Sequence, residues 1–326
     1  DHDEERREKV MGNKLIVTAA PHITGPDTTQ KIMQRVCIAL LPTLIASILI
    51  FGFNSLILTV ITVAACVFFE WGYCKLTGRE VPVGDFSAAV TGVLLAFNLP
   101  ATLPWWMAIV GAFIAIVIVK QLFGGLGYNV ANPAIVARIA LAMGFASRMT
   151  NYPHPANGID ALASATPLAV SGDLGAANYV TLLLGNHGGV LGETCAITLL
   201  LGGIYLIATK VISPVIPVTY LATVAVFSAV SGHDPIVQLL SGGLMLGAFF
   251  MATDYVTSPL TKLGQIVYGI GCGVITILIR YFGGYSEGVT YAILCMNALV
   301  PYIEILTRQD RLGIAKAKAK KEGAAK

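Results

Sequence analysis

The stretches 35–52, RVCIALLPTLIASILIFG, and 55–74, SLILTVITVAACVFFEWGYC, decide the class of fold. Each is about long enough to cross a bilayer as a helix, which takes roughly 20 apolar residues. Across all 326 residues, 56% are hydrophobic and only 12% are charged, with a mean hydropathy of +0.75. A soluble domain has about 25% charged residues, so this chain lacks the side chains that cover a water-facing surface. We therefore expect an all-α integral membrane protein.

Ten apolar runs lie along the chain, five on each side of a long loop. They are 35–52, 55–74, 86–98, 105–123 and 131–146 in the first half, and 193–209, 213–230, 240–253, 264–282 and 288–306 in the second. The third run of each half is short and has a polar end, which is typical of broken membrane helices. Because five is an odd number, a second copy of the first half would enter the membrane in the opposite orientation. The expected fold is ten transmembrane helices in two inverted five-helix repeats with short or broken third helices.

Two short matches between the halves agree with this arrangement. The stretch 91–97 (TGVLLAF) resembles 243–249 (GLMLGAF), and Phe-Gly-Gly at 123–125 recurs at 282–284. Apolar segments also resemble one another by chance, so the repeat is predicted from the matches and the run lengths together.

The positions of Lys and Arg predict the orientation, because cytoplasmic loops retain basic residues. With ten crossings and an inner N-terminus, fifteen of the eighteen Lys and Arg residues after Met11 lie on the inner side. The exceptions are Arg138, Arg148 and Arg280. Both termini are therefore expected in the cytoplasm.

These runs divide the chain into five parts. Residues 1–34 form a cytoplasmic segment, whose first ten residues, DHDEERREKV, are interpreted as an extension outside the fold. Residues 35–146 form the first five-helix repeat and 193–306 the second. Between them, 147–192 is an extracytoplasmic loop, and 307–326 is a basic cytoplasmic tail. A loop as long as 147–192 without strong secondary structure is usually functional or mobile.

Several kinds of site are not indicated. The six cysteines include no CxxC pair and lie in or beside apolar runs, so we expect small buried hydrophobes and neither a zinc site nor an iron–sulfur cluster. The histidines lack metal-ligand spacing. Because no P-loop, Rossmann glycine pattern or nucleophile elbow occurs, no catalytic residue is assigned and NAD is expected to bind elsewhere. The net charge of +3 indicates no nucleic-acid partner.

Residues 160–168 of the outer loop read DALASATPL. Read alone, this stretch is a turn with two hydroxyl groups, on Ser164 and Thr166, that ends at a proline. Ala-Thr pairs occur elsewhere in the chain and carry no information by themselves.

Three stretches together resemble the D subunit of the Rnf complex, an ion-translocating ferredoxin:NAD oxidoreductase, and its relative, the B subunit of the sodium-pumping NADH:quinone oxidoreductase. They are Pro21-His22-Ile23 with 28–33 (TTQKIM), then 123–134 (FGGLGYNVANPA), and 160–168. The resemblance covers nearly the whole chain from about Ala20. It implies an electron-carrying subunit of a redox-driven ion pump, not catalytic alone, in the inner or plasma membrane of a bacterial-type cell.

The resemblance also implies that a flavin transferase attaches FMN to Thr166 through a phosphoester, within a pattern that includes Asp160 and Ser164. The family usually has Ser or Thr where this chain has Ala163, which weakens the transferase pattern but leaves the acceptor hydroxyl. The implied partners are the other membrane and peripheral subunits of the complex, including an outer FMN-bearing subunit and a cytoplasmic NAD-reducing subunit.

A second flavin, a non-covalent riboflavin, is implied near 123–134. Its expected contacts are Gly124, Gly125, Asn129 and Asn132, since glycine permits close approach and asparagine amides both donate and accept hydrogen bonds. The alternative is a helix-entry turn in which the asparagines act as caps.

Four charged residues lie within the predicted membrane spans or at the end of one. Burying a charge in a membrane is costly, so such a residue is by default expected to be functional. Asp254 is the candidate for an ion path, with Glu70 as a second. Structural pairing or snorkelling is the alternative for Glu70 and Glu304. Arg138 could pair with a carboxylate or a flavin phosphate. Residue spacing does not discriminate between Na⁺ and H⁺ as the transported ion.

A small-solute channel or transporter, such as a urea-channel-like protein, would suit two inverted five-helix halves equally well. The long outer loop with Thr166 distinguishes the two hypotheses, because a solute channel does not need such a loop.

Overall fold

We analysed a computed structural model of the chain, which describes residues 28–79, 81–152, 176–185, 187–193, 195–283 and 287–308. The predicted flavin attachment stretch, with Asp160, Ser164 and Thr166, lies outside these residues. Every element in the described part of the chain is a helix.

The first half contains a series of helices that follows the five predicted runs. They are α2 (Thr29–Phe51), α3 (Phe53–Thr77), the short 3₁₀-helix η1 (Val83–Asp85), α4 (Ser87–Phe97), α5 (Trp105–Phe113) continued by the π-helix η2 (Ile114–Gln121), α6 (Pro133–Gly144) and α7 (Ala146–Met149). Helix α2 begins six residues before the predicted run because Thr28 caps it, with its Oγ1 accepting a bond from the Lys31 amide.

The second half follows its five runs in the same way. Its elements are α8 (Ala176–Leu184), α9 (Ala196–Ala208), α10 (Val215–Val230), α11 (Pro235–Leu240), α12 (Leu244–Leu246) continued by the π-helix η5 (Gly247–Met251), α13 (Lys262–Phe282) and α14 (Val289–Thr307). Helix α8 lies in the stretch that was expected to have no strong secondary structure. The run 240–253 is interrupted at 241–243, where Gly242 and Gly243 have φ values of 73° and 65°, a conformation that favours glycine.

Among the described residues, four helices, α2, α3, α13 and α14, are long and apolar enough to cross a membrane. The other apolar helices are shorter. Helix α4 has 11 residues, which gives roughly 16 Å at 1.5 Å per residue, about half of a bilayer core. Large apolar side chains are exposed on the long helices, for example Leu49 at 81%, Leu76 at 90% and Leu306 at 84%. Such a surface suits lipid better than water, and the protein is a multi-pass membrane protein.

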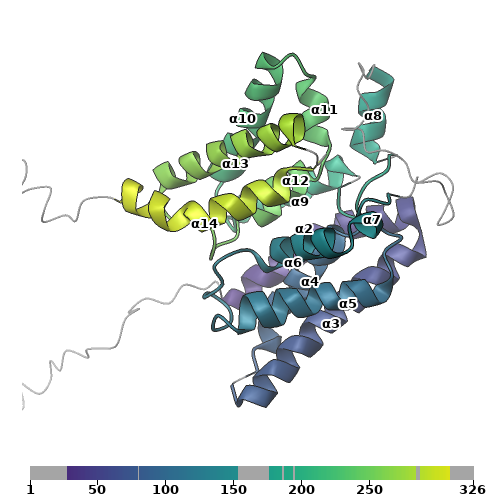
Figure 1. Cartoon of the computed structure of the whole chain (residues 1–326), viewed down its shortest axis with the longest axis vertical. Coiled ribbons are helices and arrows are strands. Elements are labelled where there is room, and N and C mark those ends of the chain that lie inside the picture. Colours follow the sequence, from purple (N-terminus) through teal and green to yellow (C-terminus); the bar gives the residue numbers. More distant parts are fainter. Residues whose placement is uncertain are drawn as a thin grey trace, which may run out of the picture.

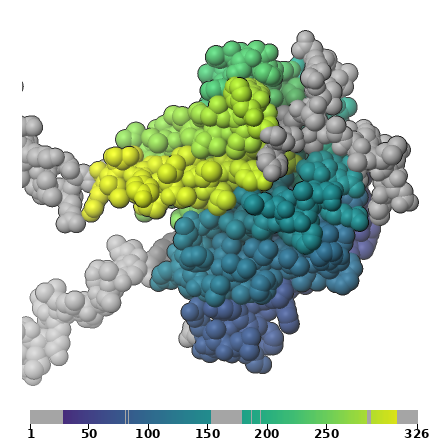
Figure 2. Space-filling model, viewed as in Figure 1, coloured from purple at the N-terminus to yellow at the C-terminus, as the bar shows by residue number. Residues whose placement is uncertain are grey.

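The two halves lie side by side and meet along α2 and α9 (Figure 1). In the first half α3 packs against α4 and α5, and in the second α13 packs against α10 and α14. The space-filling view shows the halves as two adjoining masses, blue below and green to yellow above (Figure 2).

Two adjacent glycines allow the close approach of α9 to its neighbours. A methyl group on Gly202 would overlap the carbonyl oxygen of Ala39 in α2, and one on Gly203 would overlap the ring of Phe249 in η5. Small residues commonly let membrane helices come this close. The close contact of α9 with α2, across the two halves, and with η5, within the second half, therefore depends on the absence of side chains here.

Gly202→Ala is expected to destabilise the protein by about 1–3 kcal/mol, the usual cost of overpacking, because the group in the way is backbone. Thermal unfolding in detergent should show a lower apparent Tm. The matched control is Gly72→Ala in α3, where a methyl group meets nothing within 4 Å and alanine favours the helix by about 1 kcal/mol. Equal Tm values for the two variants would contradict this account of the interface.

Candidate functional site

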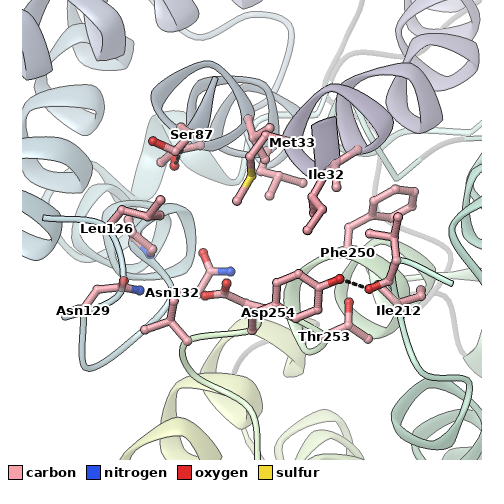
Figure 3. Close-up of a pocket in the computed structure, with 18 of the residues that line it drawn as sticks. Ile32, Met33, Ser87, Leu126, Asn129, Asn132, Ile212, Phe250, Thr253 and Asp254 are labelled. Atoms are coloured by element: carbon pink, nitrogen blue, oxygen red, sulfur yellow. Dashed lines mark hydrogen bonds between the residues drawn. The ribbon is translucent and has the colours of Figure 1, made fainter. Parts of the chain in front are cut away.

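The candidate site is a cavity between the two halves (Figure 3). Its empty space measures about 800 Å³, a volume that includes space open to the surroundings. Its walls come from α2, α4, η2, the turn before α6, the end of α9, η5 and the turn after η5. Most lining side chains are apolar. The polar ones are Ser87, Thr91, Lys120, Asn129, Asn132, Thr253, Asp254 and Tyr255.

Asn132 and Asp254 lie next to each other on one wall, opposite Ile32 and Met33 (Figure 3). Asn132 precedes Pro133 and caps α6, with its Oδ1 accepting a bond from the Ala134 amide at 3.0 Å. Its Nδ2 donates to the Met251 carbonyl at 3.4 Å, which ties the first half to the end of η5. Asp254 accepts a hydrogen bond from the Thr257 hydroxyl at 3.1 Å.

The four residues predicted near a riboflavin divide into two groups. Asn129 and Asn132 line the cavity, and Asn129 Nδ2 donates to the Ala131 carbonyl at 3.1 Å. Gly124 and Gly125 do not line it but form the turn that ends η2, with φ values of 125° and 97°. The capping interpretation thus holds for Asn132, while each amide nitrogen has a second hydrogen for another partner.

Lys120 is buried, with 2% of its surface exposed, and lines the cavity. It is one of the basic residues expected on the inner side of the membrane. Its Nζ lies 2.7 Å from Glu70 Oε1 and donates to Ser87 Oγ at 2.6 Å. Gln121 Nε2 also donates to Glu70 Oε1, at 3.0 Å. Glu70 is therefore a partner of Lys120 and lies behind the cavity wall, which matches the structural alternative considered for it.

Ser87 connects this ion pair to the start of α4. Its hydroxyl donates to Asp85 Oδ1 at 2.6 Å, and the same oxygen accepts a bond from the Ser87 amide. Phe86, between them, has a left-handed conformation with φ of 63°. Lys120, Ser87 and Asp85 had no predicted role, because only the fold brings the end of η2 to the start of α4.

Arg138 does not line the cavity. It forms an ion pair with Glu287, which precedes α14, and donates to Asn98 Oδ1 at 2.8 Å. Glu287 also accepts a hydrogen bond from the Tyr152 hydroxyl at 3.0 Å. Of the two predicted partners for Arg138, the structure thus supplies a carboxylate. Arg138, Glu287 and Tyr152 border a second cavity of about 630 Å³, which includes space open to the surroundings.

Glu304, the last charged residue singled out from the sequence, accepts a hydrogen bond from the Leu260 amide at 3.2 Å. This contact holds the turn before α13 against α14, a structural role. Among the described residues no group of three or more His, Cys, Asp or Glu side chains could hold a metal ion.

This fold and cavity define a class: a multi-pass helical membrane protein with a mostly apolar cavity between its halves, lined in part by a buried ion-paired lysine. More specifically, the chain belongs to the NQR2, RnfD, RnfE family, whose model matches residues 16–313. The resemblance found in the sequence is thereby confirmed.

Three relatives show how far the similarity extends. The D subunit of the Na⁺-translocating ferredoxin:NAD⁺ oxidoreductase complex of Acetobacterium woodii is 48% identical over 310 residues, 93% of this chain and 97% of the relative. The corresponding subunit of the proton-translocating ferredoxin:NAD⁺ oxidoreductase complex of Clostridium ljungdahlii is 38% identical, with 94% and 98% covered. The corresponding subunit of an ion-translocating oxidoreductase complex of Stutzerimonas stutzeri is 38% identical, with 88% and 93% covered.

Proposed function

We propose that this chain is the D subunit of an Rnf complex, an ion-translocating ferredoxin:NAD oxidoreductase, and that it carries electrons through the membrane in step with Na⁺ or H⁺ transport. The observation that carries the proposal is 48% identity over nearly the full length of a relative with that function in its name. It favours the redox subunit over a solute channel. Other subunits of the complex, including an outer FMN-bearing and a cytoplasmic NAD-reducing subunit, are the proposed partners.

We further propose that the chain crosses the membrane ten times as two inverted repeats, with both termini in the cytoplasm. The support comes from two cations at matching places. Lys120, near the end of the fourth helix of the first half, binds Ser87 at the start of the broken third helix. Arg280, near the end of α13, donates to the Ser241 carbonyl at the break between α11 and α12. Phe-Gly-Gly also occurs at the end of both fourth helices: it follows η2 at 123–125, and α13 ends at its first residue, Phe282.

The lining of the cavity suits a non-covalent riboflavin. Ligand pockets typically combine apolar walls with a few polar groups, as this cavity does. Ile32 and Met33 would contact the ring faces, and Asn129 and Asn132 would hydrogen-bond its polar edge. A bound flavin supplies one- and two-electron transfer, and the protein holds, orients and shields it. Covalent FMN on Thr166, attached by a flavin transferase, is the second proposed cofactor.

The proposal is tested on the wild-type chain. The complex is purified from cells that possess the flavin transferase, run on a denaturing gel and viewed under ultraviolet light. We expect a fluorescent band for this chain. In proteoliposomes, NAD reduction by reduced ferredoxin should drive cation accumulation, and an ionophore should abolish the gradient. A dark band together with absent cation accumulation would contradict the proposed function.

Asp254→Asn should lower cation accumulation by about tenfold or more, equivalent to roughly 1.4 kcal/mol or more on the transport step. Asparagine has the size of aspartate and can accept the hydrogen bond from Thr257, but it lacks the negative charge that attracts a cation. The gel band should stay fluorescent. Asp234→Asn is the control, because Asp234 caps α11 and asparagine caps helices equally well. Unchanged pumping by the Asp254 variant would remove Asp254 from the ion path.

A further inference from the structure

Glu193, three residues before the start of α9, is a buried carboxylate without a hydrogen-bonding partner among the described residues. Its side chain is 2% exposed, and neither oxygen accepts a hydrogen bond within the described part of the chain. Burying an ionised carboxylate without a partner is strongly unfavourable. A proton or a bound cation removes this cost.

The backbone holds Glu193 firmly in place. The Leu191 amide donates to the Leu99 carbonyl at 3.1 Å, and the Gly192 amide donates to the Phe97 carbonyl at 2.8 Å. A methyl group on Gly192 would overlap the Phe97 side chain. The segment before α9 is thus anchored to the end of the broken helix α4, and the carboxylate has a defined position.

The carboxylate also lies beside the break in the second half. A methyl group built on Gly243 would lie 4.0 Å from Glu193 Oε2. In the same break, the hydroxyl of Ser241 is fully buried and has no hydrogen-bonding partner in the described ranges. The break between α11 and α12 thus contains one buried oxygen without a partner, that of Ser241, and lies beside a second such group, the carboxylate of Glu193.

Three titratable side chains act electrostatically with Glu193: Tyr152, His187 and Arg280. Burial lowers the pKa of His187, the larger effect, and the nearby Glu193 carboxylate raises it. Burial raises the pKa of Tyr152. Both are therefore neutral near pH 7 and bring no positive charge to the carboxylate. Arg280 is a cation that acts on Glu193 through space. Its hydrogen bonds go to the carbonyls of Gln238 and Ser241, at 2.6 and 2.8 Å, so it forms no ion pair with the carboxylate.

We propose that Glu193 binds a monovalent cation, H⁺ or Na⁺, at the outer end of the ion path whose inner end is Asp254, with Ser241 Oγ as a further ligand for Na⁺. Carboxylate and hydroxyl oxygens are ligands that hard cations prefer. This inference rests on the proposed function, since it assigns the site to the transported ion.

Carbodiimide labelling of the purified wild-type complex tests the site without any mutation. A protonated carboxyl group in an apolar environment adds to dicyclohexylcarbodiimide and rearranges to a stable N-acylurea, which mass spectrometry locates. We expect labelling of Glu193 that increases as the pH falls. Glu287 is the internal control, because its ion pair with Arg138 keeps it ionised. Absence of label on Glu193 at every pH would overturn the proposal.

Added salt distinguishes the two cations. If the site takes Na⁺, NaCl at ten times its Kd should slow labelling about tenfold through occupancy, whereas KCl at equal ionic strength should not. If the site takes only H⁺, the two salts should act alike and pH alone should govern the rate. Both outcomes support the site and identify its occupant.

Transport by the whole complex then tests the role. Glu193→Gln should lower cation accumulation in proteoliposomes by about tenfold or more, while Glu193→Asp keeps part of it and the control Asp234→Asn keeps all of it. Accumulation at the wild-type rate in Glu193→Gln would overturn the proposal. If the wild-type complex itself moves no cation, the proposed function fails; if wild type and Glu193→Gln pump equally, only the role of Glu193 fails.

Discussion

Thr166→Val is expected to abolish covalent flavin on this chain. A phosphoester needs a hydroxyl oxygen, and valine has nearly the shape of threonine without that oxygen. Loss should therefore be complete, whereas a mere change of shape would give partial loading. The measurement is flavin fluorescence of the denatured chain on a gel, normalised to protein, with mass spectrometry of the intact chain for the bound FMN.

The control for this variant is Thr150→Val. Thr150 is another threonine on the expected outer side, exposed, and its hydroxyl bonds to the Ala146 carbonyl at 2.9 Å. This variant should remain as fluorescent as wild type. If Thr166→Val still fluoresces, the attachment site is wrong even though the family is right. Ser164→Ala tests the recognition pattern while keeping the acceptor hydroxyl, because Ser164 belongs to the predicted pattern and is not the acceptor.

Lys120→Met is expected to destabilise the protein by about 3–5 kcal/mol, the usual cost of removing one partner from a buried ion pair. Glu70 has no exposed surface, and its Oε2 has no hydrogen-bonding partner among the described residues. Without Lys120, the carboxylate keeps only the bond from Gln121. The apparent Tm in detergent and the half-life of the folded protein at a fixed temperature should both fall.

The double variant Glu70→Gln with Lys120→Met is the decisive control. It removes both charges, and replacing a buried ion pair by uncharged side chains of similar volume is often nearly neutral. The expected order of Tm is wild type, then the double variant close behind, then Lys120→Met well below. Equal Tm values for the single and double variants would show that the loss comes from packing and not from the unpaired charge.

The apolar runs could be predicted well because length and composition are local properties. Each of the ten runs lies at a helix in the structure, and the two shortest coincide with α4 and with the interrupted α11 to η5 segment. A chain without enough charge to cover a water-facing surface has few alternatives to membrane helices. What composition could not reveal was that α8 forms within the long loop, or where the second short run is broken.

The candidate site was predicted only in part. Asn129, Asn132 and Asp254 were singled out, and the fold brings all three to one cavity. Lys120 was missed because a lysine at the end of a run resembles an ordinary inner-loop residue. Glu193 was missed because it lies at the very start of the predicted run 193–209 and resembles a solvated helix start. The signal that could have found both is a charged residue inside a predicted apolar run with no opposite charge nearby in the sequence.

The sequence by itself determined that this protein is a helical membrane protein, where its helices lie and to which family it belongs. Those properties depend on hydrophobicity, run length and motifs that are continuous along the chain. Only the tertiary structure decided which charges are paired: Lys120 with Glu70, Arg138 with Glu287, and Glu193 without any hydrogen-bonding partner in the described residues. The physical reason is that a buried charge is stabilised by neighbours in space, and packing brings those neighbours from distant parts of the chain.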